Sequence, residues 1–237
     1  MFTHFRKMAR ILHVADLHLQ HDWFDWVASQ APLFDLLVIA GDLQDAFSNT
    51  PMHDQARAIG KWLLELRTPT VVCSGNHDYW TQSPRCAVDP DAEAAWLRRL
   101  AGLGSGLAVD GSTVSLGGLR IAVNGWNQVP VVDGPIDILV THAPPMGSAC
   151  ADGAEGRDVG APELWGALKF NPPRLMLCGH VHQPRRTWCR WPPPDNPTTL
   201  VLVPGCDEGA ATPAHWIIDT DKYTAKHSNE WKAVLFR

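Results

Sequence analysis

The sequence predicts an α/β protein in which two mixed β-sheets pack against each other and helices flank them. Two observations support this fold class. Up to about residue 100, short apolar runs rich in valine, isoleucine and leucine alternate with helix-like stretches, which is typical of parallel strands buried on both faces. Residues 107–126, LAVDGSTVSLGGLRIAVNGW, break that rhythm, because alternating strands meet there at Asp110-Gly111 and Gly117-Gly118 as in an antiparallel meander.

The individual elements follow from local composition. The predicted strands are apolar runs bounded by glycine, proline or aspartate, at 10–15, 35–41, 70–75, 120–126, 136–142, 174–180, 199–205 and 215–220. Amphipathic helices are predicted at about 51–67, 91–101 and 161–169. Because no repeat and no long linker divides the chain, we expect one domain over residues 1–237, with its core at about 10–220.

Composition and charge limit the classes of function. The chain has 237 residues, 45% of them hydrophobic and 19% charged, which is enough for one sizeable core. Its net charge of −5 lacks the basic footprint of a protein that grips duplex phosphates, so we expect no stable nucleic-acid partner. The six cysteines are scattered without a CxxC pair and are interpreted as reduced thiols. No segment approaches the length of a membrane span, so a cytoplasmic enzyme without a membrane partner is expected.

Side chains that can bind metals gather where the predicted strands end. The segments ADLH, AGDLQD, SGNHD, VTH and CGHVH contribute Asp16, His18, Asp42, Asp45, Asn76, His77, Asp78, His142, His180 and His182. Five of the eleven histidines fall in these short stretches. Because open α/β sheets bind ligands beyond the carboxyl ends of their strands, we expect these side chains to converge.

The types of side chain indicate the chemistry. Carboxylate oxygen, imidazole nitrogen and amide oxygen, without thiolate, suit divalent ions such as Mn²⁺, Fe²⁺, Zn²⁺ or Co²⁺. Residues two apart on a strand, as in DLH and HVH, point to the same face and can reach one centre. Seven of these side chains, namely Asp16, His18, Asp42, Asn76, His142, His180 and His182, are the candidate ligands. Seven ligands are too many for one tetrahedral ion but enough for two ions that share a carboxylate, an arrangement suited to phosphoryl displacement.

These motifs, in this order, resemble a known family. They are Asp16-x-His18, Gly41-Asp42-x-x-Asp45, Gly75-Asn76-His77-Asp78, the single His142 and Gly179-His180-x-His182. Over about residues 10–205 the chain resembles the calcineurin-like metallophosphoesterases. The resemblance implies a four-layer α/β/β/α sandwich and a dinuclear phosphoesterase, in which a hydroxide that bridges the metals attacks the phosphorus atom.

The resemblance also implies a role for each position. It assigns the first ion to Asp16, His18 and His182, the bridge to Asp42, and the second ion to Asn76, His142 and His180. His77 would face the substrate phosphate and donate a proton to the leaving oxygen or stabilise the transition state. Asp45 matches a carboxylate that can orient this histidine, although a surface acid at the start of a loop is the alternative. Manganese is the expected metal, with iron, zinc, cobalt or nickel as alternatives.

The residues beside the motifs leave alternatives open. Gly75 would allow a tight turn with close backbone approach, and Asp78 would brace its loop. Trp80, Trp126 and Asn127 would line the pocket or take part in ordinary packing. Arg185 and Arg186 would contact a phosphate or lie in a solvated loop.

Departures from the family pattern bear on the substrate. The protein Ser/Thr phosphatases have an arginine where this chain has Ala46, which disfavours a phosphoprotein substrate. Residues 141–145, THAPP, resemble a branch of small phosphoesterases that includes hydrolases of cyclic nucleotides and other diesters. We therefore expect a phosphodiesterase for small substrates such as cyclic nucleotides. The alternatives are a phosphomonoesterase for a small metabolite or nucleotide, a DNA nuclease, and a non-catalytic scaffold of the same fold.

Overall fold

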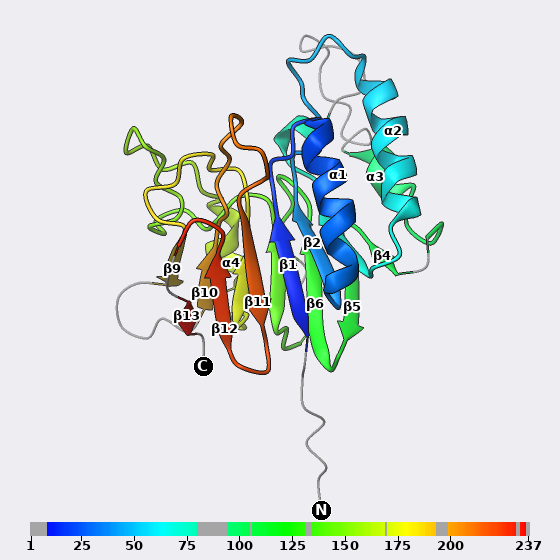
Figure 1. Ribbon diagram of the computed structural model, residues 1–237. Coiled ribbons are helices and arrows are strands. Elements are labelled where there is room, and N and C mark those ends of the chain that lie inside the picture. The colour runs from blue at the N-terminus through cyan, green and yellow to red at the C-terminus, as the bar shows by residue number, and fades with distance from the viewer. Residues whose placement is uncertain are drawn as a thin grey trace, which may run out of the picture.

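Two β-sheets packed face to face form the centre of the molecule (Figure 1). The computed structural model describes residues 9–79, 94–104, 106–130, 134–168, 170–192, 199–230 and 233–235. Within these residues the first sheet has the strand order β13-β12-β11-β1-β2-β3-β4. Its strands are β1 Arg10–Val14, β2 Leu36–Ala40, β3 Thr70–Cys73, β4 Leu107–Ala108, β11 His215–Asp219, β12 Thr224–His227 and β13 Val234–Leu235. The second sheet has the order β5-β6-β7-β8-β10-β9. Its strands are β5 Thr113–Leu116, β6 Leu119–Asn124, β7 Ile138–Thr141, β8 Leu175–Leu177, β9 Trp188–Trp191 and β10 Thr199–Leu202.

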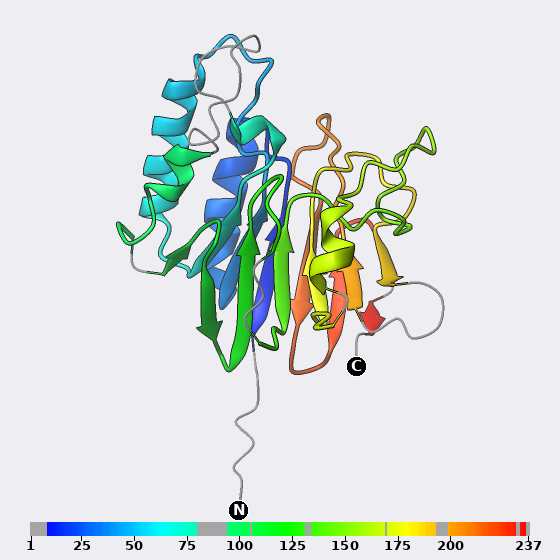
Figure 2. The ribbon, with the colours of Figure 1, turned by 180° about the vertical axis from the view of Figure 1, so that it is seen from behind.

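Helices cover the outer faces of both sheets. The helices on the first sheet are α1 His21–Gln30, α2 Met52–Glu65 and the short α3 Ala95–Arg98, and α4 Glu163–Leu168 lies on the second sheet (Figure 2). Two single 3₁₀ turns, η1 Ala31–Leu33 and η2 Asn76–Tyr79, lie between elements. The predicted sandwich of two mixed sheets between helices is therefore confirmed.

Three apolar layers hold this sandwich together, and strand β1 shows how the sequence builds them. Ile11 is fully buried between the two sheets, in a cluster that also contains Val140 and Leu177 of the second sheet. Leu12 and Val14 point the other way, into the layer beneath the helices. A third cluster packs α4 against the outer face of the second sheet. Apart from Arg10 and the buried His13, the β1 strand is apolar, as expected for a strand that is covered on both faces.

The parallel strands of each sheet bring their carboxyl ends to one edge. Strands β1, β2 and β3 are parallel neighbours, as are β6, β7, β8 and β10. The register pairs Ala40, at the end of β2, with Cys73, at the end of β3. Each metal-binding motif predicted from the sequence therefore begins where a parallel strand stops.

The predicted meander is correct at one of its two turns. Strands β5 and β6 form an antiparallel hairpin whose last pair, Leu116 and Leu119, encloses Gly117 and Gly118. The Asp110-Gly111 turn instead leads from β4 in the first sheet to β5 in the second. A turn sequence specifies that the chain reverses, but it does not specify which strand the reversed chain will pair with.

Helix boundaries agree with the sequence in part. Helices α2 and α4 lie inside the predicted ranges 51–67 and 161–169, and part of the predicted helix 91–101 falls outside the described residues. Helix α1 was not predicted, although Trp23, Phe24 and Val27 form a buried stripe on it at helical spacing. None of the helices in the described part of the chain has both the length and the apolar character that a membrane span requires.

Candidate metal centre

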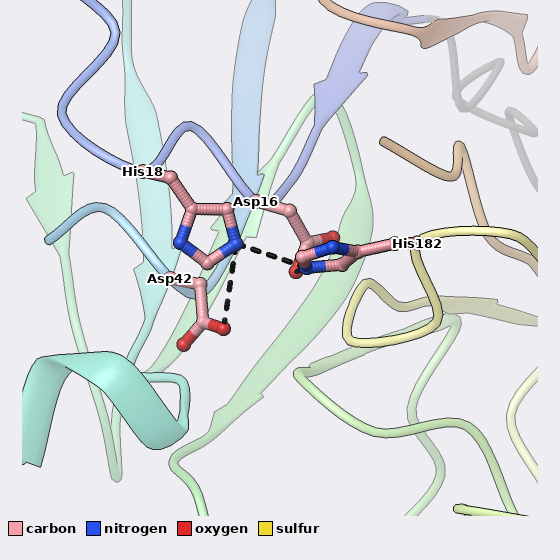
Figure 3. A group of neighbouring side chains, drawn as sticks. All are labelled: Asp16, His18, Asp42 and His182. Carbon is pink, nitrogen blue, oxygen red and sulfur yellow. Dashed lines mark hydrogen bonds and ion pairs between the residues drawn. The ribbon is translucent and has the colours of Figure 1, made fainter. Parts of the chain in front are cut away.

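Four side chains from three loops form the first group of possible metal ligands. One ligand atom from each of Asp16, His18, Asp42 and His182 lies within 4.8 Å of the others (Figure 3). The Nε2 atoms of His18 and His182 are 2.9 Å apart, and His18 Nε2 is 3.9 Å from Asp42 Oδ2. These residues follow β1, β2 and β8, so the sheet edge brings together positions more than 160 residues apart in the chain.

A second group shares Asp42 with the first. The amide oxygen Oδ1 of Asn76 lies 3.1 Å from His142 Nε2 and 2.8 Å from His180 Nδ1. His142 Nε2 is also 3.3 Å from Asp42 Oδ2. All seven metal ligands predicted from the sequence are thus brought together, in two adjoining groups with the Asp42 carboxylate between them.

The backbone orients several of these ligands. Nδ1 of His142 donates to the carbonyl oxygen of Ala40 at 2.7 Å, which leaves Nε2 to face the site. The His77 N–H donates to Asp42 Oδ1 at 2.8 Å, and the His180 N–H donates to the Asp16 carboxylate at 3.1 Å. Asp42 is therefore held by the loop that follows the neighbouring strand β3, and Asp16 by the loop that follows β8 in the second sheet.

Backbone conformation at the ligands is unusual. Asp16, His18, Asp42 and His180 have φ values of 54°, 40°, 52° and 70°, in the left-handed region that L-residues rarely adopt. Conformations of this kind persist at functional sites, where the surrounding structure holds them. Gly75 is needed for a different reason, because a Cβ atom at that position would overlap the Asp42 carboxylate. The predicted close approach at Gly75 is confirmed.

Asp78 connects two of the loops. Its buried carboxylate accepts the N–H groups of Leu43 at 3.1 Å, Gln44 at 3.0 Å and Gly75 at 2.9 Å. The first two donors belong to the loop after β2 and the third to the loop after β3. The prediction that Asp78 braces its loop is confirmed, and it braces the neighbouring loop as well.

Burial and the close approach of these carboxylates and imidazoles shift their pKa values. Burial raises the pKa of Asp16 to about 8. Burial would also raise the pKa of Asp42, but the charge and hydrogen bond of His142 hold it well below its usual range. For His142, burial would lower the pKa, but the Asp42 carboxylate outweighs this effect and raises it to about 9. Burial lowers the pKa of His18 to about 4 and that of His180 to about 3, so both rings are neutral near pH 7.

This donor set fits divalent cations. The rings of His18 and His182 are neutral near pH 7, and their Nε2 atoms face each other at 2.9 Å. At most one of these two nitrogen atoms therefore carries a proton, and the other presents a lone pair to the site. Asn76 turns its acceptor oxygen, not its amide NH₂, toward two further imidazoles. Imidazole nitrogens and oxygen ligands without a thiolate suit Mn²⁺, Fe²⁺, Co²⁺ or Zn²⁺.

Comparison with known proteins agrees with this geometry. The family model of calcineurin-like phosphoesterases matches residues 9–184. The chain belongs to the calcineurin-like phosphoesterase family. No curated protein matches the chain significantly.

The comparison with solved structures found several matches. TT1561 of Thermus thermophilus has a TM-score of 0.62 and 15% identity, with coverage of 94% of this chain and 99% of that one. Yfce, a phosphoesterase from E. coli, has a TM-score of 0.48 and 14% identity, with coverage of 96% and 100%. A metallophosphoesterase from Sphaerobacter thermophilus has a TM-score of 0.47 and 16% identity, with coverage of 96% and 89%. At this level of identity, the likeness to TT1561 supports the fold alone.

His77 lies beside the candidate metal ligands. Its ring centroid is 4.6 Å from that of His18 in an edge-to-face arrangement. Its Nδ1 accepts the N–H of Ala46 at 3.3 Å, so the neutral ring carries its proton on Nε2. The sequence analysis expected Asp45 to orient this ring. In the structure Asp45 Oδ1 instead accepts the Phe47 N–H at 2.8 Å, and the ring is oriented by the backbone one residue further on.

A pocket lies over the first group of candidate ligands. It has a volume of about 380 Å³ and is lined by His18, Gln20, Asp45, Phe47, His77, His182 and Glu208. The sequence analysis missed Gln20, Phe47 and Glu208. Glu208 follows the predicted strand 199–205, so the rule that placed the metal ligands at strand ends would have included it.

The other residues beside the motifs differ in whether they lie near the site. The half-buried Trp126 lies over the second ligand group, with its ring centroid 4.8 Å from that of His180 and 5.6 Å from that of His142. Asn127 is exposed next to it. Trp80 lies outside the described residues. Arg185 and Arg186 are exposed and do not line the pocket, as the solvated-loop alternative predicts.

Proposed function

We propose that this phosphoesterase hydrolyses small phosphodiesters, such as cyclic nucleotides, with two divalent metal ions, of which Mn²⁺ is the expected species. The observation that carries the proposal is the position of Asp42, whose carboxylate lies between two ligand groups while the His77 ring borders the first. Asp16, His18, Asp42 and His182 would hold one ion, and Asp42, Asn76, His142 and His180 the other. Two such ions supply a nucleophilic water at neutral pH and offset the negative charge of an in-line displacement.

The side chains of the protein do the remaining work. In hydrolysis, a water molecule loses a proton to the solvent as its oxygen forms a bond to phosphorus, the bond from phosphorus to the leaving oxygen breaks, and the leaving oxygen gains a proton. His77 is suited to supply this proton, because the Ala46 N–H occupies Nδ1 and the proton lies on Nε2. The hydrogen bonds at Asp42 and Asp16 keep both carboxylates in place throughout.

Charge favours a diester over a monoester. Among the residues that the structure describes, those that line the pocket include no lysine or arginine but include the acids Asp45 and Glu208. A diester carries one negative charge and a monoester close to two, so the monoester would require additional cationic support here. Ala46 stands where the protein phosphatases have an arginine. A phosphomonoesterase for a small metabolite remains the second candidate, because the ligand set alone serves either reaction.

The proposal is tested by comparing kcat/KM for bis-p-nitrophenyl phosphate and p-nitrophenyl phosphate in the presence of Mn²⁺. The same comparison is then made for 2′,3′- and 3′,5′-cyclic nucleotides. We expect the diester to be preferred by at least about tenfold, which is about 1.4 kcal/mol of transition-state binding. A tenfold preference for the monoester would overturn the diesterase proposal. If the metal-loaded protein hydrolysed none of these esters, the proposal that the protein is a phosphoesterase would fail as well.

A further inference from the structure

Phe47 is an exposed aromatic side chain at the mouth of the catalytic pocket. Its relative exposure is 88%, and its ring centroid lies 5.5 Å from that of His77. A large apolar ring so exposed lacks the free energy that burial would give it, but single exposed apolar side chains are common, so the exposure alone identifies no site. The ring is also a wall of the pocket itself.

Hydrogen bonds to a side chain of α2 hold the loop that carries Phe47 in place. Gln55 of α2 is buried, and its side chain accepts the N–H of Asp45 at 2.9 Å and donates to the carbonyl oxygens of Asp45 at 2.9 Å and Thr50 at 2.8 Å. The Asp45 carboxylate then closes a turn by accepting the Phe47 N–H at 2.8 Å. The aromatic ring is therefore presented by a fixed backbone, and binding a flat ligand there would cost little additional ordering.

Ring contacts define the two ends of the pocket. Phe47 contacts His77 at 5.5 Å between centroids, His77 contacts His18 at 4.6 Å, and His18 contacts His182 at 4.8 Å. Glu208 lies beside the His182 ring, because ligand atoms of Glu208 and His182 are within 4.8 Å of each other. Phe47 thus adjoins His77 and Glu208 adjoins His182, while the Asp45 carboxylate lies on the Phe47 side, where it accepts the Phe47 N–H.

From this arrangement we infer a nucleoside subsite whose base stacks on Phe47. The inference rests on the proposed function, in which His77 protonates the leaving oxygen, so the leaving group lies on the Phe47 side. A planar, uncharged base offers a π-face to an aromatic ring, which is the contact that proteins use to bind bases regardless of sequence. The carboxylates of Asp45 and Glu208 both line the pocket and disfavour a second phosphate group, so the subsite suits a nucleoside and not a polyphosphate.

Two esters that differ only in the base test the inference. Adenosine 2′,3′-cyclic phosphate and methyl riboside 2′,3′-cyclic phosphate share the same reacting ring and leaving oxygen. We expect the Mn²⁺-loaded protein to prefer the adenosine ester by about tenfold in kcat/KM, within the usual range for one stacked base. Phe47→Ala should abolish this preference by lowering kcat/KM for the adenosine ester about tenfold more than for the methyl riboside, and Phe47→Trp should retain it. Phe170→Ala, which removes a similarly exposed ring after α4, is the matched control and should change neither rate.

A binding measurement separates this inference from the proposed function. Calorimetry with adenosine 5′-monophosphate and ribose 5-phosphate should show about tenfold tighter binding of the former, lost in Phe47→Ala. If neither cyclic ester is hydrolysed while this difference is present, the diesterase proposal fails and the subsite stands. If both esters are hydrolysed at equal kcat/KM, or if the adenosine preference survives Phe47→Ala, the subsite is wrong and the diesterase proposal is unaffected.

Discussion

At the scale of single residues, the proposed catalytic role of His77 can be tested separately from the proposed metal binding. Its ring stands beside the ligand groups, and the ring atom Nδ1 accepts a backbone N–H rather than bonding to a ligand side chain. The backbone N–H of His77, by contrast, supports Asp42 and is kept by any substitution other than proline. The side chain can therefore be removed while the ligand set is preserved.

We predict that His77→Ala lowers kcat by about 10²–10⁴-fold, the usual contribution of general acid–base catalysis. The Mn²⁺ content, measured by elemental analysis, should stay at the wild-type level. His53→Ala is the control, because His53 is an exposed histidine on α2, away from the pocket. Loss of bound metal in His77→Ala would show that the ring is a ligand and that its assigned role is wrong.

The residue scale also shows what the sequence could and could not predict. The convergence of the seven candidate ligands was predictable because carboxylate, imidazole and amide side chains at successive strand ends meet at one edge of an α/β sheet. The orientation of His77 was not, because it depends on a main-chain N–H, and every residue other than proline has one. Phe47 was missed for a related reason, since a single phenylalanine in a sequence does not reveal that its ring is exposed.

At the scale of elements, loops after neighbouring strands support each other through Asp78. Its carboxylate accepts two N–H groups of the loop after β2 and one of the loop after β3. Burial raises the pKa of Asp78 to about 7. The ligands Asp42 and Asn76 lie in these two loops, so their spacing depends on this carboxylate.

We predict that Asp78→Ala lowers the free energy of unfolding of the metal-free chain by about 3 kcal/mol or more, because three buried N–H groups lose their acceptor. Urea denaturation measures this loss. Asp54→Ala is the control: Asp54 forms a surface ion pair with Arg57 at 3.2 Å, and such pairs contribute well under about 1 kcal/mol. Equal losses in the two variants would contradict the bracing role.

Element prediction failed where pairing depends on distant parts of the chain. The Asp110-Gly111 turn was correctly predicted as a turn, but its two flanking strands belong to different sheets. Helix α1 was missed because its ten residues include two aspartates and two tryptophans, which weaken a simple apolar pattern. Strands such as β2, which is buried along its whole length, were found because both of their faces are covered.

At the scale of the whole molecule, the metal-free site should make stability depend on pH. The folded-state pKa of Asp16 is raised to about 8 and that of His142 to about 9, above their ordinary values of 3.8 and 6.5. The folded chain therefore binds these protons more tightly than the unfolded chain does. The stability that they contribute is complete below the unfolded-state values and is lost as the pH rises through the folded-state values.

We accordingly predict that the Tm of the metal-free protein falls between pH 6.5 and pH 9, the window set by the raised pKa values of Asp16 and His142. Ligands must lose protons to bind metal, so the increase in Tm caused by Mn²⁺ should grow over the same range. Thermal unfolding with and without Mn²⁺ measures both trends. A metal-induced increase that is independent of pH would show that these protons are not displaced by the metal.

The central claim is that two ligand groups joined by Asp42 hold two metal ions that act together. The most direct measurement is the number of Mn²⁺ ions per chain after reconstitution, determined by elemental analysis alongside phosphodiesterase activity. Wild-type protein should contain two ions, and Asp42→Asn should weaken binding at both positions because one carboxylate serves both groups. A firm value of one ion per chain at full activity would contradict the claim.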